Sequence, residues 1–150
     1  MMSALLKIVK GRLAPMSLDD DKTVREGEIY AFTGFPIGEV LGLKPVTHRG
    51  MISSITPIAT PQLSSNTLDT NLIKRPREPY MVYQLDATAY PGNSGSPLYH
   101  PQTGRVVGVI NRVFVKETKE NVLERPSGIT YAIPVVHVKK LLLDSGLATD

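Results

Sequence analysis

Six short runs of apolar and β-branched residues constrain the fold of this 150-residue chain more than any other feature. Polar segments and turn residues separate the runs, which cover residues 28–34, 46–58, 80–87, 96–99, 105–115 and 128–133. Alternating or continuous apolar residues over such lengths predict strands. The 12 Gly and 12 Pro residues favour a β-rich fold, because such a fold needs many turns. Six antiparallel strands can close into a small barrel.

The two ends of the chain add one predicted helix and one predicted strand. Pro134 can open a helix, since apolar residues then recur at helical spacing from Val135 to Leu142 and Gly146 follows the expected end. Residues 4–9 are apolar and predict a short separate strand. The length fits one domain.

Composition excludes several classes of protein and site. The chain has no cysteine, which excludes disulfide scaffolds, thiolate zinc sites and thiol catalysis. Its net charge of +3 comes from scattered Lys and Arg, whereas nucleic-acid binding needs a basic stripe. No apolar run approaches the roughly 18 residues of a membrane span, and the first residues lack the basic leader of a signal peptide. We therefore expect no cofactor, metal ion, nucleic acid or membrane partner, and the compartment stays undetermined.

Residues 91–98 (Pro-Gly-Asn-Ser-Gly-Ser-Pro-Leu) form the most distinctive motif of the chain. Gly92 and Gly95 allow sharp backbone turns on either side of Ser94 and leave its hydroxyl uncovered. The same turn can direct the amides of Gly92 and Ser94 at one point, as in an oxyanion hole for acyl transfer. A plain Gly/Ser/Pro turn between two strands is the other interpretation of these eight residues.

The motif resembles the nucleophile loop of trypsin-like serine peptidases, in particular the disulfide-free HtrA-type and glutamyl-endopeptidase-like branches. Further segments resemble the same family in the same order along nearly the whole chain, at residues 4–8, 24–28, 34–38, 46–53, 85–89, 104–110 and 130–134. The resemblance implies an all-β fold: a six-stranded antiparallel Greek-key barrel with a C-terminal helix, the second barrel of a trypsin-like peptidase. It also implies three segments: a remnant strand of a missing first barrel (1–10), a linker (11–26) and the second barrel with its helix (27–150).

The resemblance also implies roles for individual residues. Ser94 matches the nucleophile, and the backbone N–H groups of Gly92 and Ser94 match the oxyanion hole. Thr88 is expected near the base of the primary specificity pocket. The strand that pairs with the substrate backbone by β-augmentation is expected at Asn111, Arg112 and Val113.

The base of the catalytic triad is the main departure from the family pattern. The aspartate should stand just before residues 4–8, where this chain has Met2 and Ser3, and the histidine should come earlier still. A serine without a base is a weak nucleophile, so low or no activity is expected of the chain alone. His48, His100 and His137 are the histidines present, and each is more typical of a structural or surface residue than of a base. Asp86 is expected to bond the backbone of the serine loop.

Three hypotheses remain open on these residues. The first is a serine endopeptidase lobe that acts on polypeptide substrates, with a separate chain or upstream segment supplying the first barrel. The second is a pseudoprotease module that binds peptides without cutting them. The third is a remnant that folds poorly alone, since the face toward the first barrel would be exposed.

Overall fold

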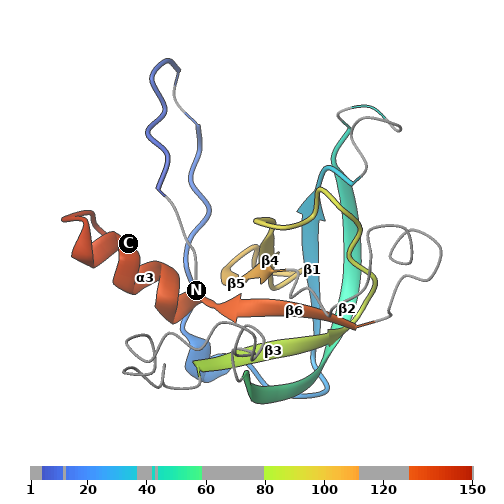
Figure 1. Ribbon diagram of the computed structural model, residues 1–150. Coiled ribbons are helices and arrows are strands. Elements are labelled where there is room, and N and C mark those ends of the chain that lie inside the picture. The colour runs from blue at the N-terminus through green and yellow to red at the C-terminus, as the bar shows by residue number, and fades with distance from the viewer. Residues whose placement is uncertain are drawn as a thin grey trace, which may run out of the picture.

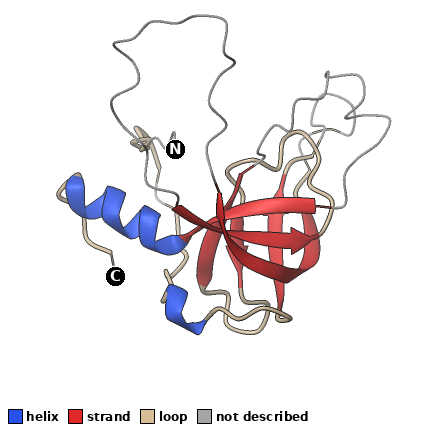
Figure 2. Ribbon diagram, turned by 60° about the horizontal axis from the view of Figure 1, so that its bottom comes forward, coloured by secondary structure: helices blue, strands red, loops and turns tan. Residues whose placement is uncertain are grey.

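Six antiparallel strands form a closed barrel in the computed structural model, which describes residues 5–11, 13–36, 42, 44–58, 80–111 and 129–149 (Figures 1 and 2). Around the barrel the strands follow the order β1-β2-β3-β6-β5-β4. Their bounds are β1 Ile29–Gly34, β2 Val46–Ile58, β3 Tyr80–Asp86, β4 Pro97–Tyr99, β5 Val106–Asn111 and β6 Ile129–Pro134. The pairing of β3 with β6 and of β1 with β4 closes the sheet. The predicted six-stranded antiparallel Greek-key barrel is thereby confirmed.

The barrel interior is filled by one large apolar side chain from nearly every strand. Phe32, Ile52, Leu85, Leu98 and Ile110 are at most 1% exposed and belong to one hydrophobic cluster. Each such side chain contributes about 1.5–3 kcal/mol by leaving water. The alternation of apolar and polar residues along the strands thus turns the apolar set inward, as the sequence pattern predicts.

A bulge in β2 allows this strand to hydrogen-bond with the residues just before β1. The pairing register of β2 with β3 shifts between Ile52 and Ser54. The freed amide of Ile55 donates a hydrogen bond of 2.7 Å to the Glu26 carboxylate, and the Gly27 amide donates to the Ile52 carbonyl at 2.8 Å. The chain also approaches closely at Gly50, because a Cβ there would lie 2.6 Å from the Ala87 methyl group.

The predicted C-terminal helix is present as α3 (Val135–Asp144), which follows β6 without a gap. Val135 is fully buried, whereas the rest of the helix is more exposed and extends from one side of the barrel (Figure 2). At its end the Ser145 amide donates to the carbonyls of Leu141 and Leu142, and Gly146 has a positive φ of 71°. A glycine in the left-handed conformation is a common helix terminator, so the sequence signal and the structure agree.

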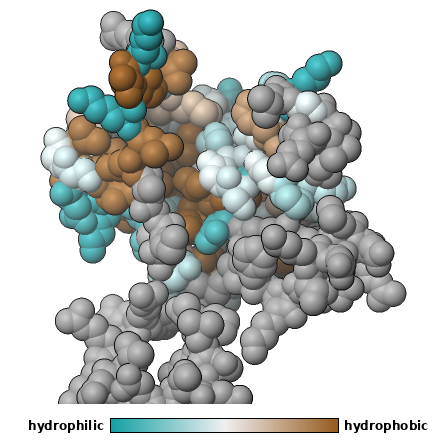
Figure 3. Space-filling view, turned by 45° about the horizontal axis from the view of Figure 1, so that its top comes forward, coloured by the Kyte–Doolittle hydropathy of each residue, from teal (hydrophilic) through white to brown (hydrophobic). Residues whose placement is uncertain are grey.

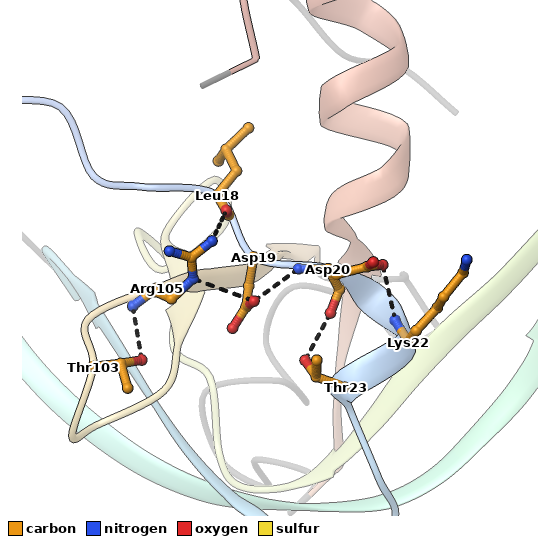
Figure 4. Close-up of polar contacts among 7 residues, drawn as sticks. All are labelled: Leu18, Asp19, Asp20, Lys22, Thr23, Thr103 and Arg105. Carbon is orange, nitrogen blue, oxygen red and sulfur yellow. Dashed lines mark hydrogen bonds and ion pairs between the residues drawn. The ribbon is translucent and has the colours of Figure 1, made fainter.

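The segment before the barrel is bound to β5 over residues 17–19. Leu18 forms a parallel bridge with Val106, the Asp19 amide donates to the Val106 carbonyl at 2.8 Å, and the Val106 amide donates to the Ser17 carbonyl at 2.9 Å. Arg105 strengthens this attachment through an ion pair of 3.3 Å with Asp19 and a hydrogen bond to the Leu18 carbonyl (Figure 4). The 3-10 helix η1 (Asp21–Thr23) follows directly. The predicted linker therefore packs on the barrel in its second half.

Residues 5–9 belong to no strand, unlike the strand predicted there. Leu6 and Val9 are 92% and 96% exposed, and the segment rises away from the barrel (Figure 1). A strand requires a neighbouring backbone edge, and no barrel strand pairs with these residues. Exposed apolar side chains are also visible over a broad area of the space-filling view (Figure 3). The assignment of residues 1–10 to a first barrel stays a prediction.

Two of the segments that connect strands are not part of the described structure. Residues 59–79, between β2 and β3, and residues 112–128, between β5 and β6, lie outside the described residues. Within the described ranges, no helix is long and apolar enough to cross a membrane.

Candidate functional site

The serine motif forms two consecutive tight turns, which we call the serine turn (residues 90–96). The Asn93 amide donates to the Tyr90 carbonyl at 3.0 Å, and the Ser96 amide donates to the Asn93 carbonyl at 3.1 Å. Gly92 and Gly95 have positive φ values of 99° and 89°. Residues with a side chain rarely adopt this conformation, so both turns depend on glycine. The two glycines predicted to bracket a sharp turn therefore do so.

Ser94 lies at the surface between the two turns. The residue is exposed, and its hydroxyl has no hydrogen-bond partner within the described part of the chain. The amides of Gly92 and Ser94 likewise donate no hydrogen bond to any described residue. An exposed hydroxyl with two uncommitted amides on its own turn is suited to hold an oxyanion.

The end of β5 anchors the serine turn. The Gly95 amide donates to the Ile110 carbonyl at 2.8 Å, and the Ile110 amide donates to the Ser96 carbonyl at 2.8 Å. Asn111, the next residue, is half-buried and pairs with Tyr131 of β6. The turn and the start of the predicted substrate-pairing strand are therefore adjacent. Arg112 and Val113, the other two residues expected on that strand, lie outside the described residues.

A buried threonine on β6 holds the chain that enters the serine turn. Thr130 is 4% exposed, and its hydroxyl donates a hydrogen bond of 2.6 Å to the Ala87 carbonyl. Thr88, expected near the specificity pocket, follows immediately and is half-buried. Asp86 was expected to bond this backbone, but its residue is exposed and bonds none of the described loop. Thr130 instead holds the chain at Ala87, before the turn, and no sequence motif indicates this contact.

Asn93 is the buried residue of the serine turn, and it packs against β1. It is 0% exposed, and its Oδ1 has no hydrogen-bond partner among the residues described. Gly34, the last residue of β1, faces it so closely that a Cβ there would lie 2.6 Å from Asn93 Oδ1 and would also overlap Ser96 Oγ. The sequence places Gly34 only at a strand end, so its contact with the turn has no sequence signal.

His48 is the histidine that contacts the serine turn. Its Nε2 lies 3.4 Å from Asn93 Nδ2, and its ring stacks on Phe32 with centroids 5.0 Å apart and planes 18° apart. The Tyr90 ring is also near, with its centroid 6.2 Å from that of His48 and the two planes tilted by 42°. Burial lowers the pKa of His48 below that of a solvated imidazole, so its neutral form is favoured.

The other two histidines each lie against a tyrosine ring. His100 lies against the edge of Tyr30 at 5.9 Å between ring centroids, and its Nδ1 accepts a hydrogen bond from the Gln102 amide. His137 lies on α3 with its ring 5.8 Å from that of Tyr80. Within the described ranges, no group of three or more His, Asp or Glu side chains is arranged to hold a metal ion. Of the three histidines, His48 alone makes a described contact with the serine turn.

Known relatives share sequence with most of this chain. The family model of the trypsin-like peptidase domain matches residues 3–109. A probable periplasmic DegP-like serine endoprotease of Halomonas elongata is 29% identical over 133 residues, which are 88% of this chain and 22% of that protein. The Do-like serine protease HtrA of Bacillus subtilis is 31% identical over 122 residues, which are 81% of this chain and 23% of that protein. The chain thus spans less than a quarter of these relatives.

A solved structure shares the fold. The HtrA-type protease AlgW, solved with a tripeptide, superposes with a TM-score of 0.60 and 26% sequence identity over 95% of this chain and 40% of that one. Three findings point to the same family. The barrel carries a glycine-bracketed serine turn, the family model covers well over half of the residues, and the relatives are HtrA-type proteases. The chain therefore belongs to the trypsin-like serine peptidase family, among its HtrA-type members.

Proposed function

We propose that this chain is the lobe of a serine endopeptidase that supplies the nucleophile, Ser94, and the oxyanion hole, the amides of Gly92 and Ser94. The observation that carries the proposal is the serine turn itself. Its hydroxyl is exposed, and the two amides donate to no described residue. Both features are needed for attack on a peptide carbonyl, since the charge that develops on the carbonyl oxygen must meet donors aimed at it.

The reaction would proceed by acyl transfer. Ser94 Oγ forms a bond to the substrate carbonyl carbon, the π electrons move to the carbonyl oxygen, and the amides of Gly92 and Ser94 hold that oxygen. The hydroxyl proton must pass to a base, which in this proposal is a histidine oriented by an aspartate on a first barrel. Without that barrel the chain alone is expected to have low or no activity.

The segment before the barrel exposes apolar side chains that another element could cover. Six apolar side chains of this segment are between 43% and 96% exposed: Leu5, Leu6, Ile8, Val9, Leu13 and Met16. Such a run of exposed apolar residues is typical of a surface that another element covers. We propose that the first barrel, on a separate chain or an adjoining segment, covers it, with residues 1–10 as its strand, 11–26 as the linker and 27–150 as the second barrel.

Polypeptides are the proposed substrates. The AlgW structure was solved with a tripeptide, which supports a peptide ligand for this fold. We propose that the peptide backbone pairs with the chain from Asn111 through Arg112 and Val113 and that Thr88 lies near the pocket for the side chain before the cleaved bond. The anchoring of the serine turn on Ile110 supports this arrangement, because it brings the nucleophile beside the start of that strand.

A non-catalytic peptide-binding module is the second candidate. One observation favours it: the Ser94 hydroxyl is hydrogen-bonded to none of the described residues, and therefore to none of the three histidines. Such a protein would use the same groove for recognition and would leave the peptide intact. The two candidates differ in the reactivity of one hydroxyl.

Active-site labelling tests the proposal. The protein at its native length is treated with a fluorophosphonate and digested, and the modified serine is located by mass spectrometry. We expect modification at Ser94, which Ser94→Ala abolishes and Ser53→Ala, a change at an exposed serine of β2, leaves intact. Peptide binding without any labelling of Ser94 would refute the enzyme proposal and support the binding module.

A further inference from the structure

We propose that His48 is a positioning residue for the serine turn, because its Nε2 accepts a hydrogen bond from Asn93, the residue between the two oxyanion amides. The catalytic meaning of this contact rests on the proposed function, whereas the contact itself does not. His48 would not touch the substrate. It would act by fixing Asn93, and through Asn93 the directions of the Gly92 and Ser94 amides.

The imidazole ring of His48 is itself held in place. His48 on β2 lies directly opposite Phe32 on β1 in the strand register, and the two rings stack nearly parallel. Phe32 is fully buried, so the surface beneath the imidazole cannot move without disturbing the core. Tyr90 of the serine turn also lies near the ring, with ring centroids 6.2 Å apart. The acceptor atom therefore has a defined direction.

Asn93 depends on this acceptor because its surroundings offer few other partners. Its backbone amide and carbonyl are already used within the turns, and its Oδ1 is buried without a partner among the described residues. Gly34 approaches the same oxygen closely, since a Cβ there would lie 2.6 Å from it. The bond to His48 is the only side-chain hydrogen bond that Asn93 makes within the described part. A buried amide that loses its single bond has an unsatisfied polar group, which favours rearrangement of the turn.

The contact requires neutral His48. A neutral imidazole with its proton on Nδ1 accepts at Nε2, whereas a protonated ring carries N–H on both nitrogens and would face the Asn93 amide N–H₂ as donor against donor. Tyr90 is the titratable group that faces the ring from the serine turn, and Phe32 faces it from β1. On its own strand Arg49 points to the opposite face of the sheet, since neighbouring strand residues alternate. Burial, which favours the neutral ring, supports the contact.

The positioning role is tested by NMR on the protein at its native length. Backbone amide shifts of Gly92 and Ser94 and the ring Cε1–H shift of His48 are followed from pH 8 to pH 5. We expect the two amides to titrate with the midpoint of the His48 ring, which burial places below the pKa of a solvated imidazole. Amides that stay constant while the ring titrates would overturn the proposal, and this result needs no variant that has to fold.

Two substitutions separate the acceptor from the ring. His48→Phe keeps an aromatic ring to stack on Phe32 but removes the acceptor, so it should shift the Gly92 and Ser94 amides at every pH. His48→Gln offers an oxygen at similar reach and cannot titrate, so it should keep the amide positions of neutral His48 and abolish their pH dependence. His100→Gln is the matched control, since that histidine contacts Tyr30, and it should leave both amide titrations unchanged.

Labelling of Ser94 links positioning to reactivity. The fluorophosphonate rate at pH 8 should fall about tenfold in His48→Phe and recover in His48→Gln, because about one hydrogen bond is lost and then restored. Equal rates in the wild type and His48→Phe would overturn the positioning role while leaving the proposed function intact. Amides that follow His48 in a wild type whose Ser94 is never labelled would support the positioning role and refute the peptidase proposal.

Discussion

Gly34→Ala is expected to displace the serine turn by steric overlap alone. Gly34 ends β1 outside the left-handed region of φ, so alanine is conformationally allowed there. The added Cβ would lie 2.6 Å from Asn93 Oδ1, whereas ordinary contact begins at 3.4 Å, and it would also overlap Ser96 Oγ. Asn93 Oδ1 must therefore move by about 0.8 Å, the difference between the two distances, and the Ser96 hydroxyl must move further, which displaces the turn.

The free-energy cost follows from how firmly the turn is held. Overpacking in a well-packed site costs about 1–3 kcal/mol. The hydrogen bonds from the Gly95 amide to the Ile110 carbonyl and from the Ile110 amide to the Ser96 carbonyl resist the displacement. We expect Gly34→Ala to lower the free energy of unfolding by about 2–3 kcal/mol. For a chain of this size that corresponds to a fall in Tm of about 4–12 °C. Labelling of Ser94 should slow as well, because the amides of Gly92 and Ser94, the proposed oxyanion hole, move with the turn.

A double-mutant cycle in urea identifies the cause. Ser96→Ala removes the hydroxyl that the new methyl group overlaps, so Gly34→Ala should cost about 1 kcal/mol less in that background than in the wild type. The measurement compares the four free energies of unfolding at one pH. Additive effects, or a Gly34→Ala variant within about 0.5 kcal/mol of the wild type, would refute the steric reasoning.

Three further perturbations test other parts of the structure. Thr130→Val removes the buried 2.6 Å hydrogen bond to the Ala87 carbonyl and should destabilise the protein by about 1–3 kcal/mol in urea, so an unchanged unfolding midpoint would contradict its role as an anchor. Because burial lowers the pKa of His48, the unfolded state binds more protons below about pH 6.5. Tm should therefore be level above that pH and fall below it, and His48→Phe should remove this part of the fall. Arg105→Ala breaks an ion pair whose arginine side chain is 49% exposed, so the free energy of unfolding should fall by less than about 1 kcal/mol in thermal unfolding. A larger loss would contradict the view that solvent screens this ion pair.

Local patterns predicted the strands, the terminal helix and the glycine-bracketed turn. Each of these features depends on a few neighbouring residues: strand periodicity, helix periodicity and the need for glycine at positive φ. Each can therefore be predicted from the sequence. The bounds of β2 match the predicted run at residues 46–58, and Gly92 and Gly95 adopt the conformation that only glycine takes easily. The strand expected at residues 4–9 is different, because pairing needs a partner edge and the described barrel provides none there.

The surroundings of the serine turn depended on tertiary structure. His48 and Asn93 are 45 residues apart in the chain, and Thr130 and Ala87 are 43 apart. No local pattern relates such pairs, since their contact depends on strand order and on the register in which β1, β2, β3 and β6 pair. The sequence by itself determined that a serine would be exposed on a tight turn between strands. Barrel closure decided which side chains hold that turn, because only closure brings β1, β2, β5 and β6 around the same few residues.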